Sequence, residues 1–300
     1  HKPIIELPGI ASVAMEGTTS SSCYTSCPQC VPARMSWITG LEPSRLGLTQ
    51  NQPASITKKS PSIIRQLNRE GWTTNLIGKS HWTNHNKVCD LKDTESLIMG
   101  LGFDNVTEVA GPRALQVVKC ELTREWEKYG LLDLYKKDLS ERYREGMNQK
   151  AWEVRPTVLP TRLYPDIWIA DRAKNRINQL SDEKPWLLWI SFVGPHEPFD
   201  TPNPWNRYDY SNFAVKERGK WIEELNNESE LKIKADQWGM KLNDANLVQE
   251  LRVDYANHLR LLDEQVTSIL KKLEKRNDWD KTAICITSDH GEMLGDAGML

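Results

Sequence analysis

One stretch decides the fold that the sequence predicts: Cys27-Pro28-Gln29-Cys30-Val31-Pro32-Ala33-Arg34-Met35-Ser36-Trp37-Ile38-Thr39-Gly40. Within it, Cys30, Pro32 and Arg34 have the spacing C-x-P-x-R. Pro32 suits the first turn of a helix, where its missing N–H is no loss, and Gly40 suits the helix end. We therefore expect Cys30 just before a short helix, whose free N–H groups and dipole favour an anion. Arg34 lies one turn further along and has the fork geometry that binds oxyanions. The stretch thus predicts a reactive group beside an anion site.

The composition is that of an ordinary globular chain, with 39% hydrophobic and 27% charged residues. Its 300 residues suffice for one large α/β domain or two smaller ones. A formal net charge of −2 gives no electrostatic reason to expect nucleic acid or an anionic membrane as a partner. No apolar run reaches the roughly 18 residues of a membrane-spanning helix. The chain shows no signal-peptide pattern and does not begin with Met, so periplasmic, secreted and cytoplasmic locations all stay open.

The six cysteines do not form the pattern of a disulfide scaffold, because three crowd into eight residues and the others are scattered. Cys285 lies in an apolar run and is expected to be a buried small hydrophobe. Cys27 and Cys30 form a literal C-x-x-C, which makes thiol redox chemistry an alternative. That motif normally follows an apolar strand, whereas residues 17–22 are polar. Zinc bound by Cys23, Cys27 and Cys30 would lack a nearby fourth ligand.

The remaining chain alternates helical and strand-like patterns, which indicates an α/β layer fold. Helices are expected at 60–71, 122–129, 131–144, 166–181 and 248–275, and strands at 72–77, 186–193 and 282–287. Ser60 should cap the first helix, with Pro61 in its first turn and Gly71 at its end. The apolar strand 186–193 suits a parallel sheet that is covered on both faces. Residues 83–165 and 201–247 are less regular, and we expect them to be insertions that shape a pocket.

Polar clusters follow three of the expected strands, at the end where α/β proteins place their chemistry. The side chains that could act there are Lys79, His81, His196, Asp289 and His290. Each alone has a common structural explanation, since a loop lysine is usually solvated and a lone histidine is usually hydrogen-bonded in a core. Asp-His-Gly is found as often in a turn as in a metal site. Their joint order along the chain, together with the C-x-P-x-R motif, favours a single site.

This combined pattern resembles the type I sulfatases of the alkaline-phosphatase-like superfamily. Residues 30–40 match the family pattern C-x-P-x-R-x-x-x-L-T-G with Ile38 for Leu, although Leu41-Glu42-Pro43 replaces the usual R-Y-P. The other matching stretches, in family order, are 7–17 with T-P-N-L-D-x-L-A-x-E-G, 78–82 with G-K-x-H, 195–199 with P-H-x-P-F and 287–296 with T-S-D-H-G-E-x-L-G-D. The resemblance covers nearly the whole chain.

The resemblance implies an α/β fold with a mixed, mostly parallel central sheet and helices on both faces. It also implies that residues 1–300 are a sulfatase catalytic domain that is incomplete at both ends. The family has a strand ending in a metal-binding Asp pair before residues 7–17, and a second active-site lysine and a small subdomain after the last residue. Ala297 stands where many relatives have His. We therefore expect this piece alone to bind metal weakly and to be much less active than a version with that strand restored.

The resemblance further implies that Cys30 is oxidised to formylglycine (3-oxoalanine) by a formylglycine-generating enzyme. Its hydrate would attack sulfur, and His81 would take a proton from the second hydroxyl to expel sulfate. Arg34 would hold the formylglycine and support the metal side. Lys79 and His196 would bind the sulfate, and His196 would also help to protonate the leaving oxygen.

The metal implied by the resemblance is a divalent cation bound by Asp289, His290 and the modified Cys30. Ca²⁺ is the expected ion, but imidazole is not a favoured Ca²⁺ ligand, so Mg²⁺ and Mn²⁺ stay open. The implied substrate is a sulfate ester of a carbohydrate or a small alcohol, because residues 198–205 resemble the glycan and choline sulfatase branch. The nearest rival is a phosphonate monoester hydrolase or phosphodiesterase of the same superfamily. The sequence predicts no oligomeric state.

Overall fold

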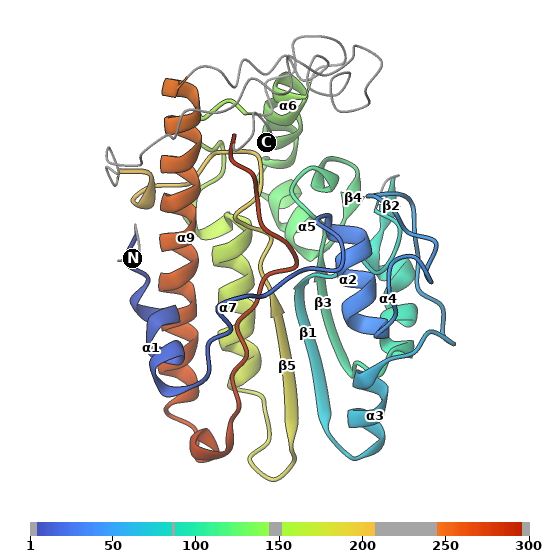
Figure 1. Ribbon diagram of the computed structural model, residues 1–300. Helices are drawn as coiled ribbons and strands as arrows, with labels where there is room; N and C mark the ends of the chain where they lie inside the picture. The colour runs from blue at the N-terminus through green and yellow to red at the C-terminus, as the bar shows by residue number, and fades with distance from the viewer. Residues whose placement is uncertain (1–4, 86–87, 144–151, 208–244, 296–300) are drawn as a thin grey trace.

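The computed structural model describes residues 5–85, 88–143, 152–207 and 245–295. Its centre is a parallel sheet of three strands in the order β3-β1-β5 (Figure 1). The strands are β1 (Thr73–Lys79), β3 (Asn105–Val109) and β5 (Trp186–Ser191). Strand β1 lies between the other two, with Ile77 opposite Thr107 on one side and Ile190 on the other. The predicted α/β fold with a parallel sheet is confirmed.

Helices cover both faces of this sheet. Because strand side chains alternate between faces, Leu76 and Ile77 enter two different apolar cores, and both are at most 2% exposed. One core packs against α2 (Cys30–Thr39), α3 (Ile63–Arg69) and α4 (Leu91–Gly100). The other packs against α5 (Glu121–Lys128), α6 (Leu132–Arg142), α7 (Pro165–Ile177) and α9 (Ala245–Leu273). In the described part of the chain, no helix is long and apolar enough to cross a membrane.

Shorter elements complete the fold. Strands β2 (Cys89–Asp90) and β4 (Val118–Lys119) form a small parallel pair, and 3-10 turns occupy Ala114–Gln116, Thr161–Leu163, Trp205–Arg207 and Trp279–Lys281. Helix α1 (Pro8–Glu16) packs beside α9, as Figure 1 shows. There the Asp263 carboxylate accepts hydrogen bonds from the backbone N–H groups of Gly9 (3.0 Å) and Ile10 (2.7 Å). Asp263, although distant in the sequence, thus accepts hydrogen bonds from the free N–H groups of the first turn of α1, as an N-cap side chain usually does.

Several predicted boundaries shift. Helix α3 begins after Ser62 and not at Pro61, so Ser60 does not cap it. The Ser60 hydroxyl instead accepts from the Thr57 N–H at 3.0 Å in the turn before the helix, and Ser62 takes the N-cap position with extended backbone. Residues 105–109 were expected inside an insertion but form β3, so this part belongs to the core of the sheet. Most of the second expected insertion, residues 208–244, lies outside the described residues, as do Asp296 and Ala297.

The predicted buried strand at 282–287 is wrong. This segment has no strand assignment, Cys285 is exposed, and Ile286 is 41% exposed. Its alternation of isoleucines has high strand propensity, but a strand also needs a neighbouring edge for its backbone, and none of the described strands pairs with it. Strand β5 is an edge strand of the described sheet and is therefore half-buried. Its two faces are nevertheless covered as predicted, because Leu188 and Ile190 pack against one core and Leu187 and Trp189 against the other. The segment that follows residues 282–287 nevertheless brings Asp289 into contact with Arg34 and His290 into contact with Cys30.

Candidate active site

Cys30 is the first residue of α2, and its side chain is buried with 4% exposure. Gln29 before it has extended backbone, and Gly40 ends the helix in the left-handed conformation (φ 68°), as predicted. The indole of Trp82 donates to the Arg34 carbonyl at 3.0 Å, which ties α2 to the segment after β1. The local sequence therefore places a thiol at a helix start that is packed against the sheet.

Four polar side chains from three other segments surround the Cys30 sulfur. His290 Nε2 lies 3.1 Å from Sγ, and Lys79 Nζ lies 3.5 Å from it. His81 and His196 are close enough to interact electrostatically with the sulfur. Residues that the sequence predicted as parts of one site, although far apart along the chain, thus meet around one atom.

The surroundings of Cys30 favour a negative charge at this position. Burial alone would raise the pKa of the thiol, but the Lys79 ammonium and hydrogen bonds from His196, His290 and His81 lower it far below its ordinary value. In return, the hydrogen bond to Cys30 helps raise the pKa of His290 to about 9. The site is thus a buried pocket of positive charge around one side chain.

Gly78 brings Lys79 to this pocket. Its φ is 107°, and a Cβ at this position would lie 1.9 Å from the Ser191 carbonyl oxygen on β5. Only glycine lets the ends of β1 and β5 approach this closely. Lys79, the last residue of β1, is 2% exposed. The glycine of the G-K-x-H motif is therefore a packing requirement for the lysine that follows it.

His81 is held in an unusual backbone conformation, with φ 57°. Burial and the Lys79 charge lower the pKa of His81 to about 3, so its ring is neutral at pH 7. Its Nδ1 is buried without a hydrogen-bond partner. The His85 ring packs edge-on 5.1 Å away, and Glu108 contacts both His85 (3.4 Å) and the Ser80 hydroxyl. His85 and Glu108 were not predicted, because no local pattern indicates their contact with this segment.

His196 is paired with its sequence neighbour Glu197, which the sequence did not single out. His196 Nδ1 lies 2.8 Å from Glu197 Oε2, and Arg113 lies 3.4 Å from the other carboxylate oxygen. Although burial opposes the charge, Glu197 and the hydrogen bond to Cys30 raise the pKa of His196 to about 10. His196 is therefore an imidazolium that faces Cys30 at neutral pH.

Two of the three nitrogens of the Arg34 guanidinium bind protein groups. Its Nε donates to Asp289 Oδ2 at 2.7 Å, and its Nη1 donates to the Lys79 carbonyl and the Ser191 hydroxyl, both at 2.8 Å. Burial would raise the pKa of Asp289, but the charges of Arg34 and Lys79 lower it below its ordinary value. Arg34 thus joins α2, the ends of two strands and the segment that carries Asp289.

Cys30, Asp289 and His290 could together hold a metal ion, since one donor atom from each lies within 4.8 Å of the others. Among the described residues they are the one such group of three or more. Sulfur and nitrogen donors suit softer ions, whereas Ca²⁺ and Mg²⁺ prefer oxygen. If the side chain at position 30 carried oxygen in place of sulfur, the donor atoms would be oxygen and nitrogen. These residues therefore fit a divalent cation that prefers oxygen ligands.

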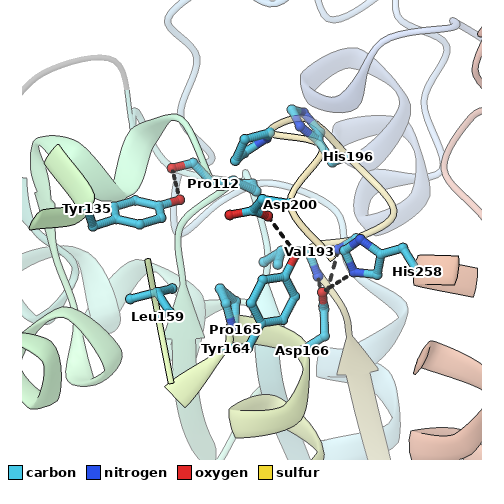
Figure 2. A pocket seen from close by; sticks show the side chains of 12 residues that line it. Pro112, Tyr135, Leu159, Tyr164, Pro165, Asp166, Val193, His196, Asp200 and His258 are labelled. Atoms are coloured by element: carbon cyan, nitrogen blue, oxygen red, sulfur yellow. Dashed lines mark hydrogen bonds and ion pairs between the residues drawn. The ribbon is translucent and has the colours of Figure 1, made fainter. Parts of the chain in front are cut away.

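A pocket lies next to this site, behind His196 (Figure 2). Its lining includes His258 from α9, Asp166 and Tyr164 from the start of α7, and Asp200 from the segment after β5. Tyr135 of α6 and Leu159 close another side, so part of the range 83–165 does border the site region. That residues 83–165 determine the choice of substrate stays a prediction.

The comparisons with known proteins agree with this arrangement. The family model described as Sulfatase matches residues 1–300. The chain is 25% identical to an arylsulfatase of Clostridium perfringens, over 97% of this chain and 59% of that protein. It is 24% identical to a choline-sulfatase of Rhizobium meliloti, over 98% of this chain and 54% of that protein. The chain therefore spans a little over half the length of these curated relatives.

Solved structures show the same fold. The phosphonate monoester hydrolase of Agrobacterium radiobacter superposes with a TM-score of 0.70 and 18% identity, over 99% of this chain and 60% of that one. A second solved structure, in complex with its substrate D-glucosamine-2-N,6-O-disulfate, superposes with a TM-score of 0.63 and 18% identity. The match covers 99% of this chain and 63% of that one. These neighbours have the alkaline-phosphatase-like fold that the sequence predicts. From the match along its whole length, the chain belongs to the sulfatase family.

Proposed function

We propose that the protein containing this chain hydrolyses sulfate monoesters and releases inorganic sulfate and an alcohol. One observation carries the proposal. Lys79, His196 and His290 converge on Cys30 in a buried pocket, where little water is present to screen their positive charge. A sulfate ester develops negative charge on its oxygens as the ester bond breaks, and preorganised cations stabilise such charge most effectively in a buried site. Family membership supports the same activity.

The nucleophile would come from position 30. We infer that Cys30 is converted to formylglycine, whose hydrate supplies an oxygen nucleophile in place of the thiol. Burial and the Lys79 charge lower the pKa of His81 to about 3, so its ring is neutral and has a nitrogen lone pair free to accept a proton. We propose that His81 takes the proton from the group at position 30, and that negative charge brought by the sulfate ester raises its pKa toward the working range of a base. A thiol with a lowered pKa would also suit redox exchange, but family membership favours the formylglycine proposal over the thiol redox alternative.

His196 and Lys79 would bind the sulfate oxygens. Glu197 keeps His196 protonated, so the ring can donate a hydrogen bond to a sulfate oxygen or a proton to the departing alcohol oxygen. Lys79 supplies a compact charge that is 2% exposed and held by the rigid end of β1. Substrate binding would thus use groups whose charge and position exist before the ester arrives.

Asp289, His290 and the side chain at position 30 would hold the divalent cation, which we propose is Ca²⁺, with Mg²⁺ and Mn²⁺ as alternatives. When bound, the cation would offset negative charge on the sulfate group. Arg34 keeps the Asp289 carboxylate ionised and fixed in place through the contact at 2.7 Å. We propose that Arg34 supports the metal side of the site by positioning this metal ligand.

For the substrate, we propose a sulfated carbohydrate or a small sulfated alcohol. The support is the similarity to relatives named arylsulfatase and choline-sulfatase, together with residues 198–205. A phosphonate monoester is also a tetrahedral anionic ester and is the rival substrate. The test is a turnover screen of the full-length protein with sulfated sugars, choline sulfate and an aryl sulfate, each compared with an aryl phosphonate monoester. Sulfate release with the higher kcat/KM supports the proposal, and preference for the phosphonate contradicts it.

A further inference from the structure

The loop of residues 192–201 carries His196 from the end of β5 to the site, and buried charged groups hold it from behind (Figure 2). At its start, the Asp166 carboxylate accepts hydrogen bonds from the backbone N–H of Val193 at 2.7 Å and of Gly194 at 3.2 Å. Asp166 lies in the first turn of α7 and is fully buried. One oxygen of this carboxylate therefore binds the loop two residues before His196.

The second oxygen of Asp166 is paired with His258. His258 Nε2 lies 2.8 Å from Asp166 Oδ2, and the His258 side chain is 4% exposed in the middle of α9. The fit is close, because a Cβ on Gly194 would lie 2.2 Å from His258 Nε2. The loop backbone thus rests directly on the ion pair, with no room for a side chain between them.

Other acidic groups face the same histidine. They are Asp254 on α9 itself and Asp200 in the loop, while Tyr164 of α7 stacks at a tilt with its ring 5.6 Å away. Asp254 accepts from the Thr201 N–H at 3.2 Å, and the Tyr164 hydroxyl donates to Asp200 at 3.0 Å. Although burial opposes the charge, Asp166 and these carboxylates raise the pKa of His258, and Arg142 of α6 offsets part of the charge on Asp200 and Asp254. The loop is held at both ends.

We propose that Asp166 and His258 are a positioning pair that fixes the 192–201 loop and so sets where His196 meets the group at position 30. This inference rests on the proposed function, because His196 is the residue that we propose binds the sulfate. Neither residue of the pair touches the Cys30 sulfur, so their effect on the reaction would act through the loop. The charge on the carboxylate matters because its two N–H partners and the histidine all point at it.

The first experiment measures hydrogen exchange of the loop amides in the full-length protein and does not depend on activity. Asp166→Asn removes the charge, and we expect exchange at Val193 and Gly194 to become roughly tenfold faster. Asp278→Asn is the matched control. Asp278 is also an ion-paired carboxylate that accepts an N–H bond, but it supports Trp186 at the opposite end of β5. Unchanged exchange in Asp166→Asn would overturn the proposal.

The second experiment measures kcat and KM for the best sulfate ester of the turnover screen. Asp166→Asn should lower kcat/KM by roughly 10- to 100-fold because His196 is displaced, whereas Asp278→Asn should not. His258→Gln keeps an N–H donor and should lose less than His258→Phe. Equal kcat/KM in Asp166→Asn and Asp278→Asn would contradict the positioning role even if the loop is looser. If the wild-type protein turns over no sulfate ester, the proposed function fails, and hydrogen exchange still decides whether the pair anchors the loop.

Discussion

The guanidinium of Arg34 and the carboxylate of Asp289 form a partly buried ion pair with Nε and Oδ2 at 2.7 Å. A second nitrogen of Arg34 binds Lys79 and Ser191 at the ends of β1 and β5. The segment that carries Asp289 has no strand pairing among the described residues, so this contact is a main attachment of the proposed metal ligand to the sheet. The contacts of Arg34 with Asp289, Lys79 and Ser191 therefore explain why the C-x-P-x-R motif has an arginine at this position.

Arg34→Lys should lower kcat for sulfate ester hydrolysis by roughly tenfold or more, because lysine cannot make the forked contacts. Affinity for the divalent cation should fall as well, since Asp289 is no longer held. Metal titration and steady-state kinetics measure the two effects. Arg65→Lys is the control, because Arg65 also makes several backbone contacts but binds Gly100, Ser60 and Lys58 away from the site. Near wild-type metal affinity and kcat in Arg34→Lys would contradict this account.

His81→Gln should lower kcat by roughly 10²- to 10⁴-fold, the range expected when a general base is lost. The glutamine keeps a polar side chain of similar length but cannot accept a proton at neutral pH. Thermal unfolding of the variant should stay near that of the wild type, which separates loss of chemistry from loss of the fold. A kcat within about threefold of the wild type would show that His81 is not the base.

Gly78→Ala should destabilise the protein far more than Gly71→Ala. Both glycines have positive φ, but a Cβ at Gly71 would meet nothing within 4 Å, whereas one at Gly78 would lie 1.9 Å from the Ser191 carbonyl oxygen. Gly71→Ala should therefore lose about 1 kcal/mol of unfolding free energy, and Gly78→Ala several times that, from backbone overlap. Urea unfolding measures both. Equal losses would mean that β1 and β5 do not approach as closely as described.

Asp200 gives a pH dependence of stability whose sign follows from its environment. Burial, with the charge of Asp254, raises the pKa of Asp200 to about 6, above its ordinary value of 3.8. The contribution of Asp200 to stability is therefore fully present below about pH 4 and is lost as pH rises through about 6. Asp200→Asn should remove this loss and raise the unfolding free energy at pH 7 by up to about 3 kcal/mol. Asp278 is the opposite case, because chiefly its hydrogen bond from Arg276 lowers its pKa to about 2.

The comparison of unfolding curves at pH 5 and pH 7 measures this effect. As pH rises from 5 to 7, the unfolding free energy of the wild type should fall because Asp200 ionises. The unfolding free energy of the Asp200→Asn variant should fall less over the same range. Asp278→Asn should instead weaken the protein at pH 7, since its contribution is present above its unfolded pKa and is lost only in acid. A wild type and Asp200→Asn variant with parallel pH profiles would contradict the raised pKa.

The residues around the sulfur could be predicted because each lies in a short local pattern. Pro32 and Gly40 bound α2, and Gly78 permits the close approach that delivers Lys79. Apolar runs placed β1 and β5 in a parallel sheet, and the polar residues after them had to meet at one end. Local patterns and the rule for parallel sheets thus contain enough information to bring Cys30, Lys79 and His196 together.

The rest depends on contacts that no local pattern specifies. The isoleucines of 282–287 gave a strand pattern, but the described sheet offers this segment no pairing, so propensity alone was misleading. Asp166 and His258 meet the 192–201 loop only because α7 and α9 pack side by side. Glu108 of β3 likewise meets His85 and Ser80 only through the pairing of β3 with β1. Such supporting residues have to be found in three dimensions.

The most direct test of the central claim is the mass of the tryptic peptide that contains residue 30, from a full-length preparation that turns over a sulfate ester. The account predicts a peptide about 18 Da lighter than the thiol form, as expected for formylglycine, whereas ordinary cysteine oxidation adds oxygen. The fraction of lighter peptide should rise in proportion to specific activity across preparations. A fully active preparation with an unmodified or oxygenated Cys30 would contradict the account.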